Sequence, residues 1–182
     1  MKKSILFTFL ILAALSSNAQ VRFGLKAGPN FSDLDGKYNS STKTGFHFGA
    51  LLEIKPNGSN FAIQPELLYS AQGTKVKPEV FEDENINYDY VTVPVIIKYY
   101  IISDFMNLEF GPQFGFLVSD NVDKTINNPV PESFDFGITG GVGINITRHI
   151  FIQGRYVVGL TEASKDAEVK NRVVQASIGY KF

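Results

Sequence analysis

The last eleven residues of the chain alternate between apolar and mostly polar side chains. From residue 174 onwards the even-numbered residues form an apolar set that ends in two aromatic residues. They are Val174, Ala176, Ile178, Tyr180 and Phe182. The other parity holds polar residues such as Gln175, Ser177 and Lys181. Successive side chains of a strand point to opposite faces, so this strand has one apolar and one mostly polar face. Such a strand is typical of a barrel with lipid outside and a polar lumen inside.

The aromatic end of the chain resembles the terminal signal by which bacterial outer-membrane barrels are recognised for insertion. A final Phe is characteristic of that signal, and we expect Ile178, Tyr180 and Phe182 to form it here. Outer-membrane lipid and the barrel-insertion machinery are therefore the first expected partners.

The amino-terminal residues 1–19 have the three parts of a secretory signal peptide. A basic start is followed by an apolar stretch at 5–15, too short for a spanning helix, and by a small-residue cleavage site at 17–19. We predict that this peptide is cleaved and that residues 20–182 form one barrel domain in the outer membrane.

Composition excludes several classes of protein. The formal net charge of -1 argues against a nucleic-acid partner, which requires a basic surface. The absence of Cys excludes a disulfide framework and a thiolate metal site. No apolar run after residue 19 approaches the roughly 20 residues of a membrane helix. A chain of this kind can cross a membrane only as strands.

Alternation recurs in eight segments, each near the roughly 9 to 11 residues that a tilted membrane strand needs. They are residues 21–31, 44–54, 61–72, 89–101, 107–118, 135–146, 150–160 and 172–182. Long polar connections alternate with tight ones at 55–60, 102–106 and 147–149. This asymmetry predicts an all-β, eight-stranded, antiparallel up-and-down transmembrane barrel with short periplasmic turns and long outer loops.

The two faces of these segments differ sharply in polarity. The outward parity contains no charged residue, whereas the inward parity carries Arg22, Lys26, His47, Glu53, Gln64, Glu66, Gln72, Lys98, Glu109, Gln113, Asp135, Asn145, Gln153, Arg155, Gln175, Ser177 and Lys181. Buried charges are costly unless they are paired. We therefore predict that Glu66, Lys98, Glu109 and Arg155 form an ion-pair network. The lumen of so small a barrel should be filled by its own side chains.

Three prolines, Pro65, Pro94 and Pro112, fall inside the predicted strands, and each removes a backbone donor from the ladder. They predict bulges at these points or strands shorter than the alternation alone indicates.

Several segments together resemble the PorT-type outer-membrane β-barrel family of the Bacteroidota. These are KAGPNFS (26–32), QPELLYSAQG (64–73), VTVPVIIKYY (91–100), GPQFGFL (111–117) and GRYVVGLT (154–161), with the terminal Phe182. The resemblance spans nearly the whole mature chain, and the three prolines match the family's pattern. It implies an outer-membrane barrel often labelled porin-like. One member of the family with a known role is tied to assembly of a protein-secretion system.

Candidate sites for chemistry are few. An enzyme at the outer rim would have to use His47 with Ser32, Asp33, Ser119 or Asp120, and nothing in the spacing fixes their geometry. The acidic stretch at 33–36 lacks the remaining ligands of a calcium loop. We expect no catalytic residue, no cofactor and no metal.

Four functions fit an eight-stranded barrel to different degrees. We favour a non-enzymatic structural, adhesion or secretion-accessory role, with a secretion-system or surface protein as the partner. A small porin-like channel is the alternative, although open pores need about 16 strands. An outer-rim membrane enzyme is a further alternative. A soluble ligand-binding barrel would need apolar residues inside and polar residues outside, the reverse of this pattern.

Overall fold

The computed structural model describes residues 19–35, 40–41, 43–76, 84–120, 133–161 and 170–182. Eight long strands dominate these residues, and a two-residue strand, β2 (Ser40–Ser41), pairs with the far end of β4. The long strands are β1 (Ala19–Asp35), β3 (Lys43–Pro56), β4 (Phe61–Val76), β5 (Glu84–Ile102), β6 (Met106–Asp120), β7 (Phe134–Asn145), β8 (Ile150–Gly159) and β9 (Lys170–Lys181). The described part of the chain contains no helix that is long and apolar enough to cross a membrane.

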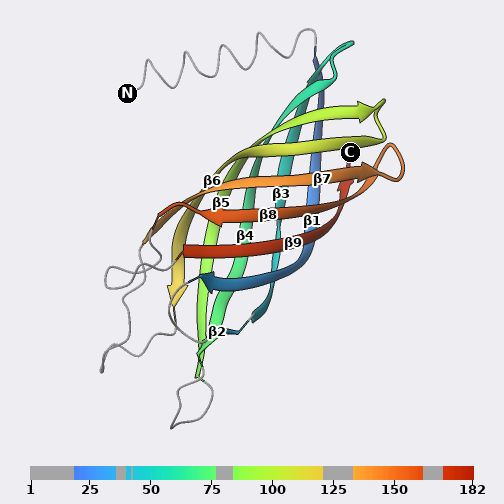
Figure 1. Cartoon of the computed structure of the whole chain (residues 1–182). Helices are drawn as coiled ribbons and strands as arrows, with labels where there is room; N and C mark the ends of the chain where they lie inside the picture. Colours follow the sequence, from blue (N-terminus) through green and yellow to red (C-terminus); the bar gives the residue numbers. More distant parts are fainter. Residues whose placement is uncertain (1–18, 36–39, 42, 77–83, 121–132, 162–169) are drawn as a thin grey trace, which may run out of the picture.

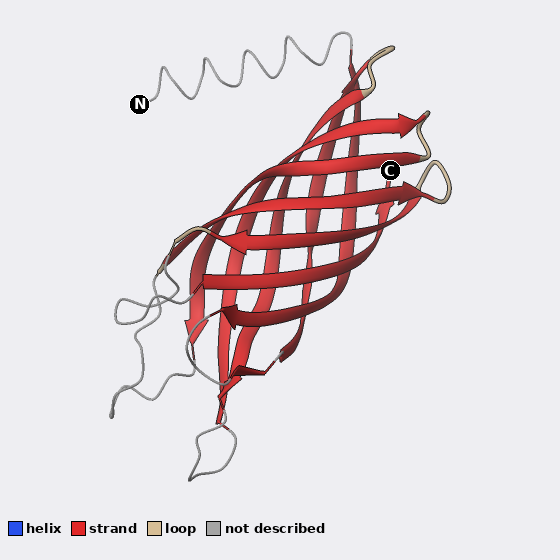
Figure 2. Cartoon of the chain, in the orientation of Figure 1, coloured by secondary structure: helices blue, strands red, loops and turns tan. Residues whose placement is uncertain are grey.

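The eight long strands form a closed barrel in which every neighbouring pair is antiparallel (Figures 1 and 2). Each long strand pairs with the next along the chain, and β1 pairs with β9 to close the cylinder. Closure leaves no unpaired strand edge, which a barrel in lipid requires because the bilayer core offers no water to hydrogen-bond the backbone. The predicted all-β, eight-stranded up-and-down barrel is confirmed.

The two ends of the barrel differ in the length of their connections. Three tight turns, at 57–60, 103–105 and 146–149, lie at the end where β1 begins and β9 finishes (Figure 2). Gly58 takes a positive φ of 73° in the first of them, a conformation that glycine adopts without steric cost. At the other end of the barrel the strands are joined by longer stretches of sequence, which fall largely outside the described residues. In barrels of this type the short turns face the periplasm.

Exposure is inverted relative to a water-soluble protein. Many large apolar side chains on the outer face are more than a third exposed, and Phe110 and Ile178 both reach 60%. Polar side chains on the inner face are buried, including His47 at 0% and Arg155 at 3%. Exposed apolar side chains on all eight long strands indicate a membrane surface, because soluble monomers rarely expose contiguous apolar patches larger than a few hundred Å².

The prediction that the prolines shorten strands or create bulges is wrong. Pro65, Pro94 and Pro112 lie inside β4, β5 and β6, and the strand register is the same on either side of each. The register shifts of the β5–β6 pair lie elsewhere, at residues 89–90 and 100–102. A proline removes one donor, whereas each strand is held by pairs along both of its edges. The flanking pairs therefore keep the register.

Two glycines allow neighbouring strands to approach closely. A Cβ atom on Gly28 would lie 1.8 Å from the carbonyl oxygen of Ala176, and one on Gly111 would lie 2.0 Å from that of Val95. Both contacts are with the backbone of a neighbouring strand, so no side-chain movement can relieve them. Gly154, on the outer face of β8, has no atom within 4 Å of such a Cβ.

We expect Gly28→Ala to destabilise the barrel by about 1–3 kcal/mol, the usual cost of overpacking, because β1 and β9 would have to separate locally. Gly154→Ala is the matched control and should unfold at the same denaturant concentration as the wild type. The stability of both variants is measured by unfolding in urea, with the gel mobility of the unboiled protein as the readout of the folded fraction. Equal stability of the two variants would contradict the close approach at Gly28.

Candidate functional site

A continuous chain of ion pairs crosses the lumen. Glu66 accepts two hydrogen bonds from the Arg155 guanidinium, at 2.7 and 2.8 Å, and also pairs with Lys26 at 2.7 Å. The Nε of Arg155 donates to Oε2 of Glu109 at 2.6 Å. These four side chains have at most 1% of their surface exposed. Arg155 thus links two carboxylates with its planar fork of donors, the geometry that arginine supplies and lysine does not.

The chain continues towards the short turns through Lys98. Its Nζ lies 3.3 Å from Oε1 of Glu109 and 3.3 Å from Oε2 of Glu53. Lys181 ends the chain, with its Nζ 3.0 Å from Oε2 of Glu53. Four cations therefore alternate with three carboxylates, and each charge has a partner of opposite sign. This alternation offsets the cost of burying them.

The chain joins opposite walls of the barrel. Arg155 lies on β8 and Glu66 on β4, which are separated by β3, β1 and β9 on one side and by β7, β6 and β5 on the other. The remaining partners lie on adjacent strands, as with Lys98 and Glu109, or two strands apart. A bond between opposite walls occupies the axis of the lumen.

Aromatic and amide side chains fill the space around the charges. The Tyr100 hydroxyl donates to Oε2 of Glu53 at 3.0 Å. The centroid of the buried Phe151 ring lies 5.6 Å from Lys98 Nζ and 5.3 Å from Lys181 Nζ. The Gln64 amide donates to Oε1 of Glu66 at 2.6 Å. The half of the lumen near the short turns is therefore packed.

A neutral cluster lies further along the lumen, around His47. Its Nδ1 is 2.7 Å from Oδ1 of Asn30, and its Nε2 is 2.8 Å from Oγ of Ser177. The Asn30 amide in turn donates to Ser70 Oγ at 2.9 Å. Both ring nitrogens of the buried histidine are thus satisfied, as buried polar groups generally are.

The structure brings the four predicted network residues, Glu66, Lys98, Glu109 and Arg155, into one chain of contacts. Sequence reasoning placed Lys26, Glu53 and Lys181 on the inner face without singling them out, and it missed Tyr100. The alternation of β5 could have identified Tyr100, because it shares the inward parity of Lys98. No pattern in the sequence shows which charge pairs with which.

The structure does not assemble the rim site around His47. Its two ring nitrogens bond to Asn30 and Ser177, while Ser32 Oγ donates to the Lys43 carbonyl at 3.4 Å. The side chains of Asp33 and Asp120 lie outside the described residues, and Ser119 is exposed. Ser177, His47 and Asn30 are linked in the order of a nucleophilic triad, with an amide where a serine triad usually has a carboxylate. His47 is fully buried, however, and Ser177 is 7% exposed, so a substrate would reach the serine only if the barrel opened.

Among the described residues no group of three or more potential metal ligands of the His, Cys, Asp and Glu types comes together. The acidic stretch at 33–36, considered for calcium, has no described side chains, so it stays outside this observation.

Aromatic rings meet where β1 and β9 reach the short-turn end. Phe182 stacks on Phe23 with ring centroids 5.8 Å apart, and it meets Tyr180 edge-on at 5.2 Å. The backbone N–H of Phe182 donates to the Phe23 carbonyl at 2.8 Å. Ile178, Tyr180 and Phe182, the residues expected to form the insertion signal, all face outward. Aromatic residues at this depth are typical of the interfacial girdle.

Comparison with protein families identifies the family of this chain. The family described as "Outer membrane protein beta-barrel domain" matches residues 15–165, most of the chain. Comparison with curated proteins gives no match.

Solved structures of small outer-membrane proteins share the fold. Neisserial surface protein A has a TM-score of 0.63 at 13% identity, covering 88% of this chain and 97% of its own. OprG from Pseudomonas aeruginosa has a TM-score of 0.57 at 12% identity, covering 91% of this chain and 97% of its own. Ail, the attachment invasion locus protein of Yersinia pestis, has a TM-score of 0.55 at 13% identity, covering 90% of this chain and 99% of its own. Identities this low show a shared architecture and nothing more specific.

Proposed function

This chain belongs to the outer-membrane β-barrel domain family, and we propose that it is a plugged barrel that acts through protein contacts of its outer loops. In this proposal the barrel is a rigid support, and the long connections at its outer end carry the specificity. The barrel passes no solute and catalyses no reaction.

One observation carries the proposal: the bond between Arg155 and Glu66, which joins opposite walls of the lumen. Both side chains are buried, and both are also bonded to further charged groups on other strands. A hydrated ion could pass only by separating these pairs, which would leave charges without partners in a confined space of low dielectric constant. An eight-stranded barrel has no width to spare around such a plug.

Two likenesses support a role in contact with other proteins. The fold is shared with a neisserial surface protein and with an attachment invasion locus protein, whose names place the first at the cell surface and the second in attachment. The sequence also resembles the PorT-type family, in which a member is tied to assembly of a secretion system. An adhesion or secretion-accessory role is consistent with both likenesses.

Conductance separates this proposal from the porin-like alternative. We expect the purified wild-type barrel in planar lipid bilayers to give no discrete current steps, because the Arg155–Glu66 bond closes the lumen. A large porin measured in the same bilayers serves as the positive control. Reproducible steps from the wild-type barrel would overturn the plugged state and favour a diffusion channel.

Loop exchange tests the contact role itself. Residues 121–132 would be replaced by a Gly/Ser linker of equal length, and partners would be captured by cross-linking in the native outer membrane. We expect the variant to insert normally and to lose a cross-linked partner that the wild type retains. A matched replacement of the short turn at 57–60 should keep that partner. An unchanged cross-linking pattern for replacements of each of the four outer loops would contradict the proposal.

A further inference from the structure

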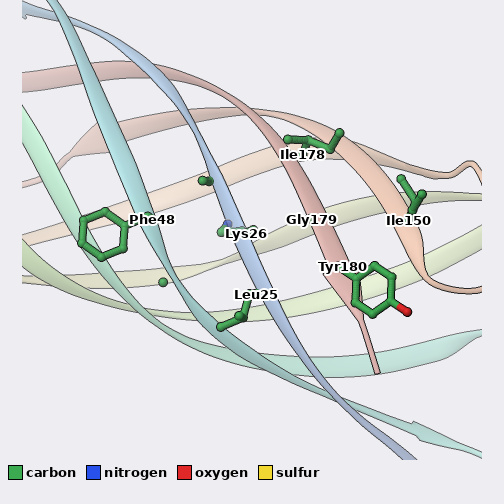
Figure 3. A pocket seen from close by; sticks show the side chains of 9 residues that line it. Leu25, Lys26, Phe48, Ile150, Ile178, Gly179 and Tyr180 are labelled. Atoms are coloured by element: carbon green, nitrogen blue, oxygen red, sulfur yellow. The ribbon is translucent and has the colours of Figure 1, made fainter.

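An apolar groove of about 530 Å³ runs across the lipid-facing surface of β3, β1, β9 and β8 (Figure 3). Ala27 occupies the middle of one row of the sheet, between Phe48 on β3 and Ile178 on β9. These two flanking side chains are 52% and 60% exposed and stand out from the surface, whereas Ala27 offers only a methyl group. The difference in size forms the groove. Leu25 and Tyr180 line the next row towards the short turns.

The groove reaches a basic turn at the short-turn end of the barrel. Ile150, which also lines it, follows the β7–β8 turn at 146–149 and pairs with Tyr180. The His149 ring stacks on the Tyr180 ring with centroids 5.4 Å apart. Its Nδ1–H donates to the Lys181 carbonyl at 2.8 Å, which holds the ring against the turn. Arg148 precedes it in the turn and is exposed.

We propose that this groove is a binding site for an anionic phospholipid, with one acyl chain along Ala27 and the phosphate at Arg148. The groove lies in the apolar band, where hydrocarbon is the surrounding medium, so its occupant is an acyl chain. The turn supplies a cation at the depth of the headgroups, and an arginine binds phosphate with charge-assisted hydrogen bonds. The tyrosine between them has an apolar ring and a polar hydroxyl, which suits the boundary between the two zones. This site does not depend on what the outer loops bind.

The absence of Trp from the chain permits a site-specific test. Leu25→Trp places one fluorophore at the groove, and Leu108→Trp places another on β6, on the far side of the barrel. The two leucines are exposed to the same degree, 49% and 47%, and both lie towards the short turns. Each variant would be reconstituted into bilayers containing brominated phosphatidylglycerol or brominated phosphatidylcholine, whose bromine atoms quench tryptophan at short range.

At Leu25→Trp we expect the anionic lipid to bind about fivefold more strongly than the zwitterionic one, the preference that one cation near a lipid surface provides. Leu108→Trp should show little preference. Adding Arg148→Gln to Leu25→Trp should remove it, and Ala27→Leu, which fills the groove, should reduce quenching by both lipids. Equal preference at the two tryptophans would overturn the site. So would weaker quenching at Leu25→Trp than at Leu108→Trp, which would indicate that protein covers the groove.

Discussion

Arg155→Met is expected to destabilise the barrel by about 3–5 kcal/mol, the cost of removing one partner from a buried ion pair. The substitution keeps an apolar chain of similar length but removes three hydrogen bonds to Glu66 and Glu109. It leaves the two carboxylates with one lysine each as their cationic partner, Lys26 at 2.7 Å from Glu66 and Lys98 at 3.3 Å from Glu109. Denaturant unfolding in lipid vesicles, followed by gel mobility, measures the loss.

Two further variants separate lost charge from lost geometry. Arg155→Lys keeps the positive charge but cannot bond to both carboxylates through a planar fork, so we expect a loss smaller than that of Arg155→Met. Adding Glu109→Gln to Arg155→Met removes the carboxylate that keeps only Lys98, leaves Lys26 paired with Glu66 and Lys98 with Glu53, and should recover part of the stability. If Arg155→Met unfolded at the wild-type denaturant concentration, the ion-pair chain would contribute nothing to the fold.

The same chain of charges shows how far sequence reasoning extends. The parity of a strand follows from backbone geometry alone, so the alternation predicted correctly that Arg155 and Glu66 face the lumen. Their contact depends on the tilt of the strands and the width of the closed barrel, and it joins residues 89 positions apart in the sequence. The His47–Ser177 bond spans 130 positions. Distances across a lumen have no local signature in the sequence.

The prolines illustrate the opposite limit, where a local rule is valid but too weak to determine how the strands pair. Pro94 lacks a backbone donor, as the rule states, yet it lies well inside the 19 residues of β5. One missing donor is a small loss beside the pairing of β5 with both of its neighbours. Barrel closure therefore overrides the propensity of single residues. It also explains why all eight strands were predicted correctly while the local effect of the prolines was not.

Deleting Phe182 is expected to remove most of the assembled barrel from the outer membrane of expressing cells. The local contacts of this residue are modest, namely one backbone hydrogen bond to Phe23 and ring contacts with Phe23 and Tyr180. Together they account for about 2 kcal/mol, from the usual contributions of one hydrogen bond and an aromatic pair. Phe182 is 64% exposed and therefore contributes little packing beyond these contacts. Recognition of the chain end by the insertion machinery would add an effect in cells that refolding of the purified chain does not share.

The two contributions are separated by measuring both assembly and stability. We expect the deletion to refold in detergent with a small loss of stability, whereas the heat-modifiable form in the outer membrane is nearly lost. Phe182→Tyr keeps an aromatic end and should assemble well, whereas Phe182→Ser should behave like the deletion. If assembly in cells fell only as far as stability in detergent, Phe182 would act through its contacts with Phe23 and Tyr180. Phe182 would then serve only to stabilise the contact between β1 and β9, and the recognition signal would have to lie elsewhere in the strand.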